Sequence, residues 1–361
     1  MSDFDHFIGT QAVSEKHQFD TAALSAWLSQ HLAGFQGPLT IEMFKGGQSN
    51  PTYKLITRQR QYVMRSKPGP VARLLPSAHA IEREFKVMGA LYGTDVPVAH
   101  MYCLCDDESV IGRAFYVMEF VPGRVLWDQA LPGMTPIERS AIYDEMNRVI
   151  AALHTVDPAA RGLADFGKPG NYFERQIGRW SKQYAASIIQ PIAEMDKLIS
   201  WLPDNIPDSA RGTGMTRIVH GDFRMDNLMF HPTEPRALAV LDWELSTLGH
   251  PLADFSYHCM AWHIPPGAFR GIGGLDVQSL GIPTEDAYIQ RYCERTGLTT
   301  PEALEADWNF YLSYNLFRLA AILQGIAKRA ETGTASSAQA VDSGANARGL
   351  AEMAWKFAQR A

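Results

Sequence analysis

The most informative stretch of the sequence begins at Ile218 and reads Ile-Val-His-Gly-Asp-Phe-Arg-Met-Asp-Asn. It places Asp222 two residues after a histidine and Asn227 five residues after Asp222. Fifteen residues beyond Asn227, Asp242 follows the apolar run Ala-Val-Leu. A phosphoryl-transfer site needs a carboxylate that accepts a proton, and it needs an amide and a second carboxylate that can hold Mg²⁺. The sequence therefore predicts such a site, with Asp222 as the acid and Asn227 and Asp242 as the metal-binding pair.

The spacing His-x-Asp-x₄-Asn is that of the protein-kinase catalytic loop. The triplet alone is a weak signal, but an aspartate at the end of the next hairpin strand makes it a strong one. The alternative is that these are turn and cap residues of a hairpin, although turn chemistry does not require this order. Arg224 stands two residues after Asp222, where protein kinases carry lysine. We predict that it neutralises charge on the moving phosphoryl group.

Two charged residues upstream fit the same chemistry. Arg65 ends a predicted strand and Glu84 lies on the next predicted helix. A cation and a carboxylate in these places suit a pair that orients the α- and β-phosphates of ATP. Arginine keeps its charge and offers a forked donor, so it can stand where kinases have lysine. The alternative for Arg65 is an ordinary surface charge on a strand.

Two further segments are candidates for nucleotide contacts. The turn Lys-Gly-Gly-Gln-Ser-Asn, which ends at Ser49 and Asn50, could cover phosphates with its backbone N–H groups. It matches neither G-x-G-x-x-G nor a P-loop, and a plain hairpin turn explains it equally well. Residues Glu119 to Val121 are predicted to offer adenine a backbone C=O and N–H, with Met118 at the back of the pocket.

Composition narrows the class of protein. The 361 residues are 46% hydrophobic and 20% charged, as in ordinary globular proteins, and the length suggests about two domains or lobes. A net charge of -6 argues against a nucleic-acid binder, and eight Trp with 17 Phe argue against disorder. Four cysteines are too few for a secreted disulfide scaffold. With neither a signal peptide nor an apolar run near the ~20 residues of a membrane span, we predict no membrane contact and a cytoplasmic location.

Periodicity predicts an α+β fold instead of alternating βαβ units. An arm and helix occupy residues 1–34, a nucleotide-binding β lobe 35–121, and a helical lobe with the catalytic loop and the acceptor site 122–361. The predicted helices are 20–34, 78–92, 136–154, 171–201, 283–295, 301–331 and 346–360. Strands are expected within 39–65, as a hairpin within 110–121, and within 217–242.

Three motifs carry a resemblance to a known family. They are His-Gly-Asp-Phe-Arg-Met-Asp-Asn, Val-Leu-Asp-Trp-Glu and Pro-Leu-Ala-Asp-Phe. On these residues the chain resembles the aminoglycoside phosphotransferase and choline-kinase-like superfamily over about residues 25–330. The resemblance implies a protein-kinase-like bilobal fold, with a small β-sheet lobe and a larger helical lobe. It also implies Asp222 as base, Asn227 and Asp242 as Mg²⁺ ligands, Arg65 on the nucleotide phosphates with Glu84 as partner, and Asp254 as a brace of the catalytic loop.

Within that superfamily, the runs at 74–79, 178–184 and 241–249 resemble one branch. This branch occurs as a kinase domain ahead of acyl-CoA dehydrogenase domains. It implies phosphorylation of a hydroxyacyl-CoA or a hydroxy acid instead of an antibiotic. The present chain contains no dehydrogenase domain.

The residues also limit the acceptor. Only twelve positions separate Asp242 from Asp254, too few for the activation segment with which a protein kinase holds a peptide. The predicted pocket wall, 255–283, contains one acid and one base, whereas cationic aminoglycosides need an acidic pocket. Three cations on one predicted helix face could meet a carboxylate or a CoA phosphate, and the alternative is a solvated basic face. They are Arg175, Arg179 and Lys182.

These observations predict a kinase that uses ATP and Mg²⁺ to phosphorylate a hydroxyl on a small-molecule acceptor, a hydroxy acid or a hydroxyacyl-CoA. One alternative is an aminoglycoside or amino-alcohol phosphotransferase. Another is a nucleotide-binding pseudokinase that serves as an interaction module. The intact Asp222, Asn227 and Asp242 argue against the pseudokinase.

Overall fold

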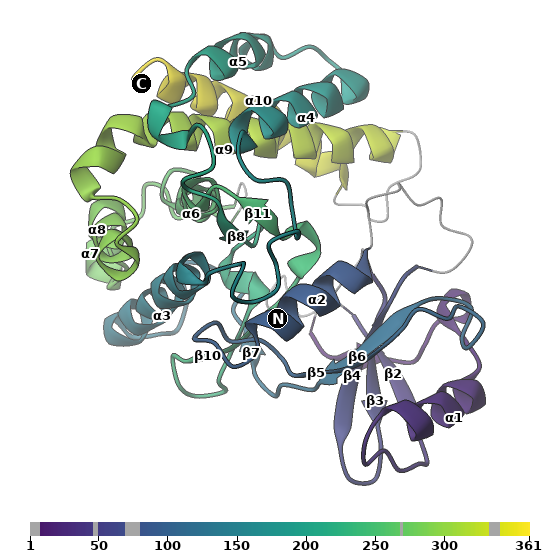
Figure 1. Cartoon of the computed structure of the whole chain (residues 1–361). Coiled ribbons are helices and arrows are strands. Elements are labelled where there is room, and N and C mark those ends of the chain that lie inside the picture. The colour runs from purple at the N-terminus through teal and green to yellow at the C-terminus, as the bar shows by residue number, and fades with distance from the viewer. Residues whose placement is uncertain (1–7, 46–49, 69–79, 268–269, 332–339) are drawn as a thin grey trace. The chain divides into compact units, whose positions relative to one another are not determined.

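The fold is described from a computed structural model that covers residues 8–45, 50–68, 80–267, 270–331 and 340–361, with the backbone alone for 340–345. The chain divides into two compact units. Unit 1 comprises Met1–Val125 and Leu228–Ser246, and unit 2 comprises Leu126–Asn227 and Thr247–Ala361. In Figure 1 the purple and blue part of unit 1 carries the larger sheet, and unit 2 carries most of the helices.

Unit 1 is built on a six-stranded antiparallel sheet with the strand order β1-β2-β3-β4-β6-β5. Its strands are β1 (Thr10–Gln11), β2 (Thr40–Phe44), β3 (Thr52–Ile56), β4 (Gln61–Ser66), β5 (Met101–Cys105) and β6 (Phe115–Glu119). Helix α1 (Thr21–His31) begins at Asp20, whose carboxylate accepts the N–H groups of Ala22 and Ala23. Leu24 and Leu28 of α1 join the apolar core that covers one side of this sheet.

Strand alternation places Arg65 on the other side of the sheet. Met64 belongs to the core beneath α1, so its neighbour Arg65 points to the opposite face, toward helix α2 (Ile81–Leu91). Tyr116 of β6 lies directly across from Arg65 in the strand register and shares its face. Glu84 of α2 is buried there, so the arginine, the tyrosine and the carboxylate meet at one place.

A second, smaller sheet completes unit 1. It has the order β10-β9-β7, from β7 (Arg124–Val125), β9 (Leu228–Phe230) and β10 (Ala237–Val240). The Val240 N–H donates to the Pro97 carbonyl over 2.8 Å, which ties this hairpin to the first segment of the chain. Gly123 passes so close to β9 that a Cβ would lie 2.5 Å from the Phe230 carbonyl oxygen, so only glycine fits there.

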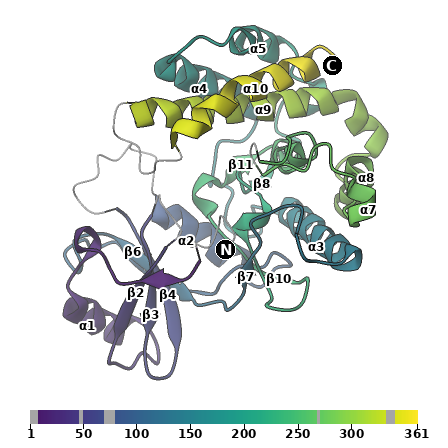
Figure 2. The same ribbon diagram turned by 180° about the vertical axis from the view of Figure 1, so that it is seen from behind.

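Unit 2 is mainly helical, with one two-stranded sheet formed by β8 (Arg217–Val219) and β11 (Thr247–Gly249). Helix α9 runs through it and packs against α4, α6 and α10, and Figure 2 shows α10 alongside α9. The helices are α3 (Pro136–Thr155), α4 (Tyr172–Ser187), α5 (Ala193–Asp204), α6 (Pro251–Cys259), α7 (Val277–Leu280), α8 (Glu285–Thr296), α9 (Pro301–Glu331) and α10 (Ala340–Ala358).

The predicted α+β class and the β-then-helical order are confirmed, but several details of the element prediction were wrong, among them the omission of helix α6 and strand β11. The helix expected over 171–201 is two helices, because Pro191 cannot continue a helix and α5 begins after it. Strand β5 at 101–105 was not predicted, and only its partner β6 lies in the hairpin expected within 110–121. Helix α10 begins at Ala340, six residues before the predicted start. Among the described residues, no helix is both long and apolar enough to cross a membrane.

Candidate functional site

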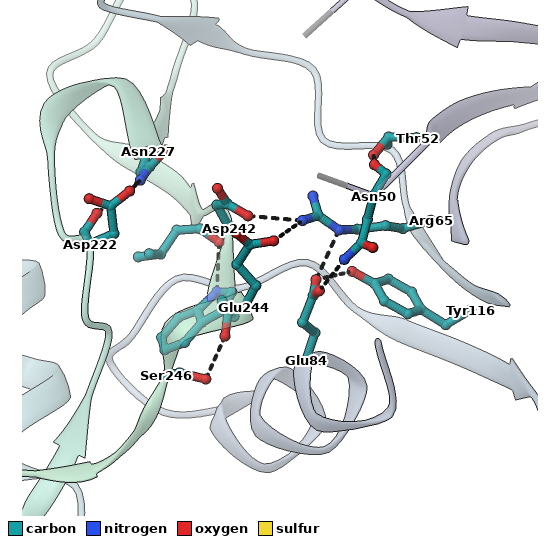
Figure 3. A network of polar contacts seen from close by, with 12 residues as sticks. Asn50, Thr52, Arg65, Glu84, Tyr116, Asp222, Asn227, Asp242, Glu244 and Ser246 are labelled. Atoms are coloured by element: carbon teal, nitrogen blue, oxygen red, sulfur yellow. Dashed lines mark hydrogen bonds and ion pairs between the residues drawn. The ribbon is translucent and has the colours of Figure 1, made fainter. Parts of the chain in front are cut away.

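In unit 1, Arg65 is the centre of a buried charge cluster, drawn in Figure 3. Its Nε lies 3.0 Å from Glu84 Oε2, and its Nη2 lies 2.9 Å from Asp242 Oδ1 and 3.6 Å from Glu244 Oε2. Glu84 in turn accepts hydrogen bonds from the Tyr116 hydroxyl over 3.0 Å and from Asn50 Nδ2 over 3.1 Å. The structure thus brings together three predicted site residues, Arg65, Glu84 and Asp242.

The cluster is held together by opposite charges, of which Arg65 and Glu84 are almost shielded from water while Asp242 and Glu244 are partly exposed. Burial would lower the pKa of Arg65, but Glu84, Tyr116 and Asp242 outweigh it and raise that pKa above its usual value. Burial also raises the pKa of Glu84, against the opposing effect of Arg65. Each charge is therefore stable only while its partner is present.

Asp242 owes its position to a short anchored turn. It follows β10 by two residues and adopts the left-handed conformation, with φ 62° and ψ 62°, which aspartate tolerates better than most residues. The next residue, Trp243, is buried, and its Nε1 donates to the Val240 carbonyl over 2.9 Å. The Ser246 hydroxyl donates to the Trp243 carbonyl over 2.6 Å. These bonds fix the backbone from which the Asp242 carboxylate projects.

In unit 2, the loop after β8 is braced by Asp254, in the first turn of α6. Its carboxylate accepts the backbone N–H of His220 over 2.7 Å and that of Gly221 over 2.8 Å. Burial would raise the pKa of Asp254, but hydrogen bonds from His154 and His220 hold it below its usual value. Asp254 therefore stays ionised and keeps the loop in one conformation, which is the role that the family resemblance implied.

The Asp222 carboxylate is held by three donors of unit 2. The Tyr257 hydroxyl donates to Oδ1 over 2.7 Å, while Asn227 Nδ2 and Arg224 Nη2 each lie 3.1 Å from Oδ2. Asn227 Nδ2 also donates to the Asp222 carbonyl over 2.8 Å, so cation binding would fall to its amide oxygen. Burial, followed by the charge of Asp222, raises the pKa of Tyr257, so its hydroxyl remains a donor.

Arginines and a second carboxylate, Asp226, lie near Asp222 in the same unit. Asp226 Oδ2 lies 2.9 Å from Arg270 Nη1 and 3.5 Å from Arg224 Nη2, and it bridges the two side chains. Arg318 of α9 is buried, donates to the Gly221 carbonyl and lies 4.7 Å from the centre of the Tyr257 ring. Sequence reasoning gave no role to Asp226, Tyr257, Arg270 or Arg318. Asp226 lies inside the loop itself, whereas Tyr257, Arg270 and Arg318 come from segments far apart in the chain, and no spacing rule links them.

The remaining predicted nucleotide contacts stay predictions. Ser49 lies outside the described residues, and the Asn50 side chain is buried against Glu84. Met118 pairs with Val63 in the sheet, and the Glu119 N–H already donates to a neighbouring carbonyl. Val121 lies in the connection after β6.

The predicted basic helix face is only partly exposed. Arg179 and Lys182 are exposed, but Arg175 is half-buried and donates to the carbonyls of Lys168 and Gly170, which anchors the loop before α4. One of the three expected cations therefore has a structural role. The described residues contain no cluster of three or more His, Cys, Asp or Glu side chains that could hold a metal ion.

Removal of the Tyr257 hydroxyl tests whether it positions Asp222. We expect Tyr257→Phe to lower kcat by about tenfold, since one net hydrogen bond to a charged group is worth ~1.5–3 kcal/mol and only part of it is lost at the transition state. The KM for nucleotide should stay unchanged. Steady-state kinetics would show this split between kcat and KM.

Tyr184→Phe is the matched control, because it also removes a buried tyrosine hydroxyl, one that accepts the Ile192 N–H between α4 and α5. It should cost stability without lowering kcat. An equal fall of kcat in both variants would reduce Tyr257 to a packing residue.

Comparisons with known proteins agree with this geometry. The sequence profile described as "Phosphotransferase enzyme family" matches residues 40–306. "Acyl-CoA dehydrogenase family member 10" of Mus musculus is 48% identical over 326 residues, which are 90% of this chain and 30% of that protein. The chain thus spans less than half the length of this curated relative.

Solved structures give the same picture. The crystal structure of a candidate aminoglycoside phosphotransferase from Ralstonia eutropha is 64% identical, with a TM-score of 0.87, and the match covers 95% of this chain and 99% of that one. Choline kinase from Cryptosporidium parvum matches at a TM-score of 0.63 with 12% identity, covering 94% and 96%. Aminoglycoside phosphotransferase APH(4)-Ia, in a ternary complex with ADP and hygromycin B, matches at 0.58 with 14% identity, covering 92% and 97%. At such low identity the last two show a shared fold alone.

Proposed function

Because the chain belongs to the phosphotransferase enzyme family, whose members transfer phosphate to hydroxyl groups, we propose that it moves the γ-phosphoryl group of ATP to the hydroxyl of a hydroxy acid or a hydroxyacyl-CoA. The observation that carries this proposal is the Asp222 carboxylate, fixed by three donors in a loop that Asp254 braces. A carboxylate held in this way can orient an acceptor hydroxyl and take its proton as the new O–P bond forms.

The other residues of the loop supply charge. Arg224 is side by side with Asp222, with 3.1 Å between Nη2 and Oδ2. From that position its guanidinium would neutralise negative charge on the phosphoryl group as the group passes to the acceptor oxygen. Asn227 holds both the carboxylate and the backbone of Asp222, which keeps the base aligned with the incoming hydroxyl.

The residues fit the magnesium ion that this chemistry uses. An amide oxygen from Asn227 and a carboxylate from Asp242 are hard oxygen ligands, and Mg²⁺ sites in kinases need only one or two such groups beside phosphates and water. Asn227 directly precedes β9 in the chain. Strand β10 is the antiparallel partner of β9, and Asp242 stands two positions after its last residue. A bound Mg²⁺ would neutralise charge on the nucleotide phosphates.

Arg65 and Glu84 form the proposed phosphate-binding pair. We expect Arg65→Ala to raise the KM for ATP, because it removes a phosphate contact, and to lower the free energy of unfolding by about 3–5 kcal/mol, because it leaves Glu84 buried without its counter-charge. ATP kinetics and urea unfolding measure the two effects separately.

The double variant Arg65→Met/Glu84→Leu separates binding from stability. Apolar residues of similar size should restore most of the stability, because no charge is left buried alone. The KM for ATP should stay high, because the cation is still missing. A normal KM in this double variant would contradict the phosphate role of Arg65.

The charged residues near Asp222 support an anionic acceptor over a cationic one. The segment 255–283, which includes the second half of α6 and all of α7, has the single acid Asp276 and no acidic cluster for a polycation. Around Asp222 the structure places Arg224 and Arg270 instead. The relative named as an acyl-CoA dehydrogenase family member is consistent with an acyl acceptor.

A screen with γ-labelled ATP tests the proposal. Hydroxy acids, hydroxyacyl-CoAs, choline and aminoglycosides would be supplied as acceptors at equal concentration, and label in the product would be counted. We expect label on the acids or their CoA esters. Faster labelling of kanamycin-like polycations would favour an aminoglycoside phosphotransferase, and ATP binding with no labelled product would favour the pseudokinase.

We also propose a cytoplasmic setting. Cys103, Cys105, Cys259 and Cys293 are all free thiols, and burial raises the pKa of Cys103 to about 12 and that of Cys293 to about 11. Thiols kept protonated in this way are unreactive, and reduced cysteines are typical of cytosolic proteins.

A further inference from the structure

A small, partly enclosed cavity lies in unit 2 beside the Asp222 loop. One side of it is apolar and the other carries two guanidinium groups and a phenol. The apolar side is formed by Met260, Ala261 and Ile264, and the polar side by Arg224, Tyr257 and Arg270. A hydrocarbon with a negatively charged oxygen group matches both sides.

The two arginines are held in place before any ligand arrives. Asp226 bridges them, with its side chain only 4% exposed, and Arg270 lies 5.8 Å from the centre of the Trp127 ring. Burial and, after it, the charge of Arg224 lower the pKa of Arg270, so a negatively charged ligand group beside the pair would be favourable.

The cavity lies next to the proposed base. Tyr257 lines it, and its hydroxyl is 2.7 Å from Asp222 Oδ1. His258, also in its wall, is neutral, because burial lowers its pKa to about 4. The charge offered to a ligand therefore comes from the arginines, and Arg224 Nη2 lies 3.1 Å from Oδ2 of Asp222, the carboxylate that would receive the hydroxyl proton.

We propose that this cavity binds an oxyanion of the acceptor, gripped by Arg224 and Arg270, so that the acceptor carries a carboxylate or a phosphate in addition to the hydroxyl presented to Asp222. The proposal rests on the proposed kinase function and narrows it. Arg270 becomes a residue that selects the acceptor, while nucleotide binding does not depend on it.

The test uses four acceptors with the same hydroxylated chain. They are the free hydroxy acid, its CoA thioester, its pantetheine thioester and the corresponding diol. The first two carry an oxyanion, a carboxylate in one and CoA phosphates in the other, and the last two are uncharged. ADP release gives kcat/KM for each acceptor and the KM for ATP with wild-type enzyme and with Arg270→Gln.

We expect wild type to prefer an anionic acceptor, and Arg270→Gln to lower kcat/KM for that acceptor by about 10–100-fold, the value of one charge-assisted hydrogen bond. The diol and the ATP KM should be unaffected, and Arg270→Lys should retain part of the preference. Arg291→Gln is the control, because it removes the same charge from an exposed arginine of α8 that pairs with Asp144. Thermal unfolding of each variant checks that it folds.

The outcomes separate the two claims. A preference for the free acid that Arg270→Gln removes supports the proposal and assigns a carboxylate, and the same result for the CoA over the pantetheine thioester assigns a CoA phosphate. If wild type uses the diol as well as the acid, or if Arg270→Gln slows all four acceptors equally, the oxyanion site is overturned while the kinase function stands. If none of the four is phosphorylated, both fail.

Discussion

Asp222→Asn should lower kcat by about 10²–10⁴-fold, the usual range for loss of a general base. Asparagine has the same shape and keeps one oxygen for the Tyr257 hydroxyl, but it cannot accept a proton. ATP affinity and the fold should stay near wild type. Because a loose phosphoryl-transfer transition state needs little proton abstraction early on, much of this loss would reflect positioning of the hydroxyl.

Rapid-quench kinetics with the identified acceptor would measure this step directly. Asp226→Asn is an informative companion, because it also removes a carboxylate near Arg224 but leaves the base in place. It should affect the acceptor KM more than the rate of the chemical step. Full kcat in Asp222→Asn would remove Asp222 from the role of base.

Asp242→Ala should abolish most Mg²⁺-dependent nucleotide binding, and Asn227→Ala should weaken it less. The carboxylate brings the charge that holds the metal, whereas the amide brings only a dipole. With ~1.5–3 kcal/mol for a contact to a charged group, the loss in Asp242→Ala is about 10–100-fold in affinity. Titration of Mg²⁺ at fixed ATP, followed by calorimetry, gives both values.

Asp242 also contacts Arg65, so a loss of ATP binding alone would not identify a metal ligand. Glu244→Gln provides the control, because Glu244 also contacts Arg65, 3.6 Å from Nη2. That variant should leave the Mg²⁺ dependence intact. If the Mg²⁺ dependence of ATP affinity is unchanged in Asp242→Ala, Asp242 is not a metal ligand.

The parts of the site that the sequence predicts are those in which one short segment carries the chemistry. The loop from His220 to Asn227 holds the proposed base, the arginine and the amide within eight residues, so its spacing is readable without a structure. Arg65 and Glu84 were also paired correctly, because a strand and the following helix are expected to pack together. For this pair, the order of strand and helix in the sequence is enough to predict the contact in the structure.

Other parts depend on packing between distant segments. Tyr257 reaches Asp222 from α6, and Arg318 reaches the same loop from the middle of α9, where its neighbours are apolar. Nothing in the spacing of these residues distinguishes them from core aromatics or ordinary charges. Strand β5 escaped prediction because Met-Tyr-Cys-Leu-Cys does not alternate between apolar and polar residues.

Unit 1 is assembled from two stretches of chain, and this has a consequence for how the protein is made. Its second stretch, 228–246, supplies β9, β10 and Asp242, the partner of Arg65. A ribosome adds about 5–20 residues per second, so the 121 residues from position 125 to 246 take roughly 6–24 s to emerge. Until β9 (Leu228–Phe230) is synthesised, late in that interval, the nascent first segment lacks the strand beside β7. During synthesis the edge of β7 is therefore unpaired until the second stretch of unit 1 has been made.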